Sequence, residues 1–401
     1  MNAERRTTLG VAAVFCAVVG LYDALYVTLI FIGGPLIGPL HEISFADFAV
    51  FHAAARAFFD GKLALVYDVN AFTHYQTEVV AELRALGVRF RPFLYPPTWL
   101  LLVLPLGLLA LKPAAALFMT LTAAAATLAE GLRRPWAWLA VLTSPAAVWV
   151  VLSGQNTFLS LALLYGGMRL LDRSPAIAGV LLGLLSYKPQ IWILVPLALV
   201  AARQWRALAW MVAAVLGLVA ASVATFGPGL WLAFLQASHD AATPQAANEM
   251  FEQMYMHMTN LLPAARLIGL PPVIGAGLQI AGAVAAAVAV WQAFRRYGQS
   301  ESRTALLVAA TFLVSPYMLN YELLLLMPAL VILFGQGLRQ GFHPGELLIY
   351  VTLWLIPTLG MILNRAGLPL MALVVVLFAV LAWVRLQSAA KVELPIVSQA
   401  R

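Results

Sequence analysis

Long apolar runs recur along the chain and decide what it can fold into. The stretches 207–226 and 272–290 are apolar on every helical face and rich in Leu and Ala, and they lack the alternation of barrel strands. Of the 401 residues, 63% are hydrophobic and only 10% are charged, against about 25% charged in soluble domains. Inside lipid, every backbone N–H and C=O must be paired within the chain. The sequence therefore predicts an all-α polytopic membrane protein.

The lengths of the apolar segments predict about 12 transmembrane helices, since each crossing needs about 20 residues. Two segments, 176–187 and 190–201, are too short and are predicted to be half-helices broken at Tyr187-Lys188-Pro189. Within 97–130, one of two pieces is predicted to be short or re-entrant, and the sequence leaves open which. The other apolar segments are 9–33, 136–152, 156–171, 207–226, 272–293, 304–316, 321–336, 346–362 and 368–385.

Basic residues predict the orientation of the chain. They form small clusters between the apolar runs, as the positive-inside rule expects, so the net charge of +7 does not indicate a nucleic-acid partner. Both termini are then cytoplasmic. The loops 34–97 and 227–260 and most other polar residues lie on the extracytoplasmic side. We interpret 1–401 as a single membrane domain.

The first outer loop has structure of its own. Residues 45–59 are mostly apolar, with Asp47, His52 and Arg56 interspersed. This pattern predicts a helix lying on the outer membrane surface, capped from Ser44 and ended by Gly61. A second, more polar amphipathic helix is predicted over 71–86.

Asp47 is the first candidate for chemistry. A carboxylate at a helix N-terminus is held ionised, which suits a general base, and the neighbouring Phe45, Phe48 and Phe51 tune its proton affinity. The alternative is a helix cap with no further role.

Lys188 is the second candidate. Because proline disfavours helical geometry at the preceding residue, the backbone breaks at Lys188, and a cation at a break in the membrane suits an anionic group such as phosphate. The alternative is a lysine whose charged end reaches the membrane surface.

Other polar residues gather at the predicted outer turns. Amides in Gln155 and Asn156 suit sugar hydroxyls, although the same pair also suits an ordinary polar turn. Tyr95 and Glu322 are candidates whose alternatives are helix initiation and helix capping. Asp23, inside the first apolar run, is a candidate whose alternative is a pairing with a neighbouring tyrosine. The remaining candidates are Gln190 and Asn320.

No signature of a metal or nucleotide site is present. His52, His74, His239 and His257 are scattered, without a metal-binding spacing, and the chain has neither a Walker A loop nor a dinucleotide fingerprint. We therefore expect no metal, no cofactor and no nucleotide partner.

Several motifs together resemble a known family. They are Asp47-Phe48-Ala49-Val50-Phe51-His52 through Arg56 and Gly61, Tyr95-Pro96-Pro97 with Pro105-Leu106, Ser153-Gly154-Gln155-Asn156, Gly179 to Gly183 leading to Tyr187-Lys188-Pro189-Gln190, and Ser315-Pro316-Tyr317. In this order the chain resembles glycosyltransferase family 87, the polyprenol-phosphate-mannose-dependent mannosyltransferase-like family of GT-C type. Family members often carry His or Asp after the Ser-Pro motif, where this chain has Asn320-Tyr321-Glu322, so the donor sugar and the acceptor stay open.

The resemblance implies a GT-C fold in a bacterial inner membrane, with the active site facing the periplasm. It implies a polyprenyl-phosphate donor of a mannose-like hexose or a pentose, a glycolipid or glycan acceptor, and Asp47 as the catalytic base. The expected reaction inverts the anomeric carbon. Lys188 and Arg91 or Arg89 would stabilise the leaving phosphate, with His52, Tyr95, Gln155, Asn156, Gln190, Asn320 and Glu322 as further substrate-binding candidates.

Two other classes of function fit parts of the pattern. A secondary transporter or lipid-linked sugar flippase would explain the broken helices, but the polar groups gather on the outer face and no two-half repeat is visible. A non-catalytic partner in envelope assembly would keep the fold and need no base.

Overall fold

The computed structural model describes residues 14, 18, 21, 25, 45–80, 92–130 and 135–393. Within these ranges the chain forms α- and 3-10 helices and no strands, so the all-α prediction is confirmed for them. The predictions for Asp23, Ser44, Arg89, Arg91 and most of 9–33 lie outside the described residues.

The main helix of the predicted first outer loop is largely buried in the protein. This helix, α2 (Ala46–Phe59), buries nine residues, including Phe48, Phe51 and His52. It contacts α5 (Pro97–Val103), the 3-10 helix η2 (Leu104–Leu108), α6 (Leu111–Glu130) and α8 (Pro145–Ser153). Neighbouring helices thus cover most of the apolar residues of α2. The position of this helix at the outer membrane surface stays a prediction. The second helix, α3 (Val69–Val79), begins at Asp68, whose carboxylate accepts the Ala71 N–H.

Broken helices form the middle of the chain. The predicted segment 136–152 divides into α7 (Pro135–Leu142) and α8, because Ser144 caps α8 and Pro145 cannot donate a backbone hydrogen bond. The predicted break at Lys188 is confirmed. It separates α10 (Pro175–Leu184) and η3 (Leu185–Tyr187) from α11 (Pro189–Trp192) and α12 (Leu194–Ala201), while α9 (Thr157–Leu170) precedes α10.

Six helical stretches in the described residues are long and apolar enough to cross a membrane. They are Leu111–Ala129, Trp205–Phe226, Pro272–Arg296, Asn320–Gln340, Glu346–Arg365 and Leu370–Ser388. These correspond to α6, α13 (Trp205–Phe226), α17 (Pro272–Arg296), η5 (Asn320–Leu325) with α19 (Leu326–Gln340), α20 (Glu346–Arg365) and α21 (Leu370–Glu393). They indicate an integral membrane protein, and the total of about 12 crossings stays a prediction. Within 97–130 the short piece is the first, Pro97–Leu108.

The predicted second outer loop, 227–260, is helical throughout most of its length. It contains α14 (Pro228–Ala241), α15 (Pro244–Met254) and η4 (Tyr255–His257), and α16 (Leu261–Leu267) follows. Asn260 fastens its end to the segment after α18 (Glu301–Val314): its amide donates to the Ser315 carbonyl at 2.6 Å, and its side-chain oxygen accepts the Met318 N–H at 2.6 Å. Residues 315–319 are held in place by these bonds, and we call them the fixed wall.

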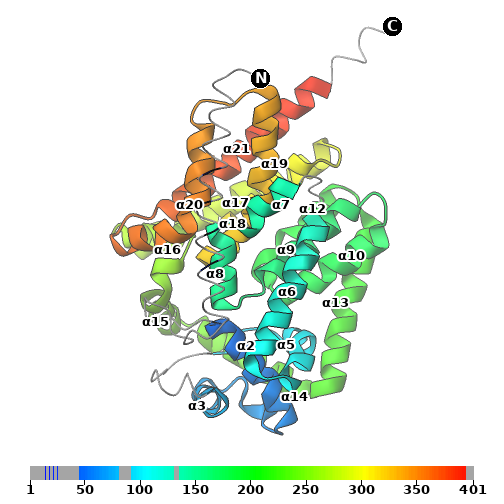
Figure 1. Ribbon diagram of the computed structural model, residues 1–401, viewed down its shortest axis with the longest axis vertical. Coiled ribbons are helices and arrows are strands. Elements are labelled where there is room, and N and C mark those ends of the chain that lie inside the picture. Colours follow the sequence, from blue (N-terminus) through cyan, green and yellow to red (C-terminus); the bar gives the residue numbers. More distant parts are fainter. Residues whose placement is uncertain are drawn as a thin grey trace.

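The helices separate into two ends (Figure 1). Helices α2, α3, α5 and α14 gather at one end, whereas α19 and α21 reach the other. Near the latter end, the buried Arg385 on α21 pairs with the buried Glu346 on α20. The site described next lies where α2 meets α8, α9 and η5.

Candidate functional site

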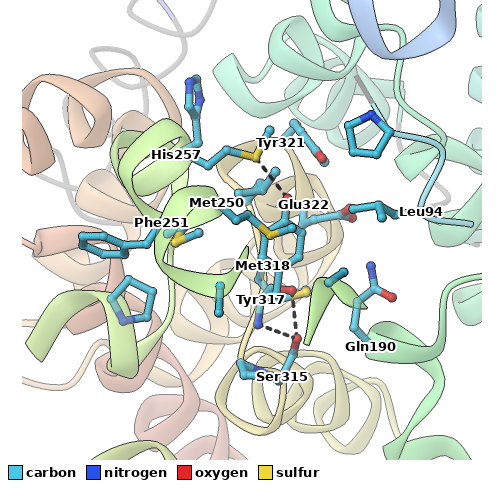
Figure 2. Close-up of a pocket in the computed structure, with 18 of the residues that line it drawn as sticks. Leu94, Gln190, Met250, Phe251, His257, Ser315, Tyr317, Met318, Tyr321 and Glu322 are labelled. Carbon is cyan, nitrogen blue, oxygen red and sulfur yellow. Dashed lines mark hydrogen bonds between the residues drawn. The ribbon is translucent and has the colours of Figure 1, made fainter. Parts of the chain in front are cut away.

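A cavity of about 1240 Å³ lies among the elements that the sequence places on the outer side. Its lining comes from α2, the α8–α9 turn, the break at Lys188, helices α15 to α17 and the segment 315–322. Figure 2 shows Met250 and Phe251 from α15, Ser315, Tyr317 and Met318 from the fixed wall, and Tyr321 and Glu322 from η5 around this space. Elements distant in sequence thus share one pocket.

Asp47 lies on the cavity wall in the first turn of α2, as predicted for a carboxylate at a helix start. The N-cap residue is Phe45, in a left-handed conformation with φ 59°, and its N–H donates to the Leu152 carbonyl at the end of α8. Gly154 ends α8, also with positive φ. A Cβ atom on Gly154 would lie 2.4 Å from the Cβ of Phe48, so α2 begins in direct contact with this turn.

Asp47, Gln155, Lys188, Tyr321 and Glu322 line one part of the cavity, which we call the polar floor. Within it, Gln155 connects Asp47 to Tyr321. Its Nε2 donates to Asp47 Oδ2 at 2.8 Å and to the Tyr321 hydroxyl at 3.1 Å. Its Oε1 accepts from the Tyr95 hydroxyl at 3.3 Å and from the Asn156 N–H at 3.3 Å. Because an ionised carboxylate only accepts hydrogen bonds, this pattern fixes which way the amide faces.

Lys188 and Glu322 form a buried ion pair beside this amide. Their side chains are 1% and 3% exposed. The Lys188 ammonium also donates to Asn156 Oδ1 at 2.7 Å, and the Thr157 hydroxyl donates to Glu322 Oε2 at 3.2 Å. The structure thus brings together four predicted residues, Gln155, Asn156, Lys188 and Glu322, next to Asp47.

Aromatic rings surround the polar floor. The Lys188 ammonium lies 6.0 Å from the ring centre of Tyr95 and 5.8 Å from that of Tyr321. Tyr317 lines the same space, and its hydroxyl contacts Met254 on α15. Aromatic faces and hydroxyls together suit a ligand with both apolar and hydroxyl-bearing surfaces.

Another wall of the cavity is apolar. From α15 it carries Met250, Phe251 and Met254, and from α16 and α17 it carries Leu262 and Pro272. Arg266 of α16 holds α15: its guanidinium donates to Asn248 Oδ1 at 2.9 Å and stacks on the Phe251 ring at 3.9 Å. Methionine adapts to ligands of irregular shape, so this wall suits a flexible apolar chain.

Three predicted binding residues do not reach the cavity in the structure. His52 is buried, with its Nε2 2.8 Å from the Leu109 carbonyl oxygen. Asn320 is buried behind the floor, and its amide donates to the Pro357 carbonyl at 3.1 Å. Asn156 is covered by its own neighbours. Gln190 does line the cavity, and Arg91 lies outside the described residues.

Several lining residues were missed by sequence reasoning. His257, Tyr317, Tyr321 and Arg266 all face the cavity. Burial lowers the pKa of His257 below its usual value, so this imidazole is neutral at pH 7. Tyr317 was signalled only by the Ser-Pro-Tyr motif. His257 was missed because 227–260 was interpreted as a loop rather than as helices. Among the described residues, no group of three or more His, Cys, Asp and Glu side chains could hold a metal ion.

The comparison with protein families gives one match. The model of "Glycosyltransferase family 87" matches residues 93–316, more than half of the chain. The match includes the α8–α9 turn, the break at Lys188 and, at its end, Ser315 and Pro316. No curated protein and no solved structure is significantly similar to the chain.

Proposed function

The chain belongs to glycosyltransferase family 87, and from this premise we propose that it moves a sugar from a polyprenyl-phosphate donor to a hydroxyl of a lipid or glycan acceptor. The membership makes it a membrane glycosyltransferase. The donor class, the acceptor, inversion at the anomeric carbon and the extracytoplasmic side of the membrane are parts of the proposal.

The observation that carries the proposal is a single cavity with two unlike walls. One wall holds a carboxylate, amides and tyrosine hydroxyls, and the other holds Met250, Phe251 and Leu262. A lipid-linked sugar has the same division, because its sugar needs hydrogen bonds and its prenyl chain needs apolar contact. A nucleotide sugar would leave the apolar wall unused, and no phosphate-binding loop is present in the sequence.

Asp47 is the proposed general base. It takes the proton from the acceptor hydroxyl as that oxygen bonds to the anomeric carbon. The bond from this carbon to the phosphate oxygen breaks, and polyprenyl phosphate leaves with the electron pair. The Gln155 amide donates to Asp47 Oδ2 at 2.8 Å and so holds the carboxylate on the cavity wall.

The charge near the leaving phosphate needs a cation. Lys188 was predicted for this role, but Glu322 already offsets its charge inside the protein. Arg91, which lies outside the described residues, therefore stays the predicted partner of the phosphate, with Arg89 beside it. The family's proposed donor, a mannose-like hexose or a pentose, also stays a prediction.

The experiment that tests the proposal compares donor classes with one purified protein. Wild type in lipid nanodiscs is given radiolabelled polyprenyl-phosphate mannose and polyprenyl-phosphate pentose in parallel with nucleotide sugars, and membrane lipid extract is the acceptor. We expect labelled product from a polyprenyl-phosphate donor alone, with the opposite anomeric configuration. Transfer from a nucleotide sugar, or none from any lipid-linked donor, would contradict the proposal.

A further inference from the structure

The buried pair of Lys188 and Glu322 connects three segments that are far apart in the sequence. Lys188 lies at the break before α11, Glu322 lies in η5, and both contact the turn between α8 and α9 through Asn156 and Thr157. These contacts are all within the protein, and both charged side chains are at most 3% exposed.

Such a pair is costly unless every charge is matched. Removing two charges from water carries a penalty of several kcal/mol each, which close geometry and additional hydrogen bonds offset. Here Asn156 accepts from the ammonium and Thr157 donates to the carboxylate. The ammonium therefore has its partners in the protein and is not an unpaired cation awaiting an anion.

Each member of the pair is connected to a neighbour of the Gln155 amide: Lys188 bonds Asn156, and Glu322 follows Tyr321 in the chain. Asn156 directly follows Gln155, and Tyr321, whose hydroxyl accepts from Gln155 Nε2, directly precedes Glu322. Gln155 in turn donates to Asp47. Any shift of Lys188 or Glu322 is thus passed through one backbone step to the hydrogen bond on Asp47.

We propose that Lys188 and Glu322 are positioning residues, which hold the Gln155 amide against Asp47, and that Lys188 does not bind the donor phosphate. The inference rests on the proposed function, since Asp47 must be the base for its position to matter. It also explains why a carboxylate is tolerated on the floor of a cavity that receives a phosphate-bearing lipid: the ion pair has no net charge.

The test is a steady-state comparison with the polyprenyl-phosphate sugar that wild type uses. Glu322→Gln keeps the shape and removes the charge. We expect kcat to fall about tenfold or more, because small displacements of a catalytic group are costly, whereas donor KM stays within about threefold.

If Lys188 instead served the phosphate, the same variant would free its ammonium. Donor KM would then fall and kcat would hold or rise, and either result would overturn the inference. Exchanging the charges, with Lys188→Glu and Glu322→Lys together, should restore part of kcat over either single variant if the pair positions. Failure of the exchange to improve on both single variants counts against the proposal.

A milder variant keeps the test sharp where charge removal prevents folding. Thr157→Val removes one hydrogen bond to Glu322 and leaves the pair intact, so we expect a smaller loss of kcat with donor KM unchanged. The control is Thr122→Val, at a buried threonine whose hydroxyl bonds the Phe118 carbonyl in α6, and it should leave both unchanged. Absence of transfer by wild type would refute the proposed function itself, whereas an active wild type together with an unchanged kcat in Thr157→Val would refute only the positioning role.

Discussion

Gly154→Ala is the substitution for which the structure gives the clearest expectation. Gly154 has φ +71°, and a Cβ atom there would lie 2.4 Å from the Cβ of Phe48. Ordinary contact begins near 3.4 Å, so α2 and the turn must separate by about 1 Å. Phe48 directly follows Asp47, and Gln155 directly follows Gly154. The separation therefore falls on the 2.8 Å hydrogen bond between Gln155 and Asp47.

Two terms set the size of the effect on stability. A left-handed backbone costs an L-residue about 1–2 kcal/mol, and overpacking in a tight interior costs about 1–3 kcal/mol. Together they predict a loss of about 2–5 kcal/mol in the free energy of unfolding. Misplacing a catalytic group by about 1 Å also lowers turnover by about 10²-fold.

The assay pairs sugar transfer with thermal unfolding in detergent, and the matched control is Gly61→Ala. Gly61 has a similar φ of +67°, but nothing lies within 4 Å of its added Cβ. The control should therefore show only the backbone cost, with near-normal turnover. If Gly154→Ala and Gly61→Ala lower the transition temperature equally and both retain turnover, the contact between α2 and the turn does not hold Asp47.

Two further predictions concern the stability of the folded protein. Glu346→Gln leaves the buried Arg385 without its carboxylate, so we expect a loss of about 3–5 kcal/mol in stability, measured by thermal unfolding, while donor KM is unchanged in the protein that remains folded. Burial lowers the pKa of His257 from its ordinary 6.5, so the unfolded chain binds a proton more readily and stability should fall as pH decreases below about 6.5. His257→Gln should flatten that part of the stability profile; an unchanged slope would show that His257 does not cause it.

The sequence predicted the fold class and most of the polar floor for physical reasons. Apolar runs favour helices in lipid, and the proline after Lys188 favours a break. Both features depend on short stretches of sequence and need no knowledge of tertiary contacts. Asp47, Gln155, Lys188 and Glu322 were all recognised as polar residues at predicted outer turns. Their meeting in one cavity required only that these turns face the same side.

What the sequence could not predict depends on which partner covers each residue. The stretch 45–59 has the same apolar composition whether it faces lipid or protein, so the burial of α2 under its neighbours was not visible. The charge of Lys188 suggested an anionic ligand, but its match with Glu322 lies 134 positions away in the chain and depends on tertiary contact. The helices within 227–260 were missed because their mixed composition resembles that of a polar loop.

The central claim is that Asp47 acts as the base in transfer from a lipid-linked sugar. The most direct measurement is the rate of label transfer from a polyprenyl-phosphate sugar by wild type and Asp47→Asn, with Asp68→Asn as the control. Asp68 is an exposed helix cap, and asparagine also caps helices, so the control should retain its rate. We predict that Asp47→Asn loses about 10²-fold or more. Turnover by Asp47→Asn at the wild-type rate would contradict the account.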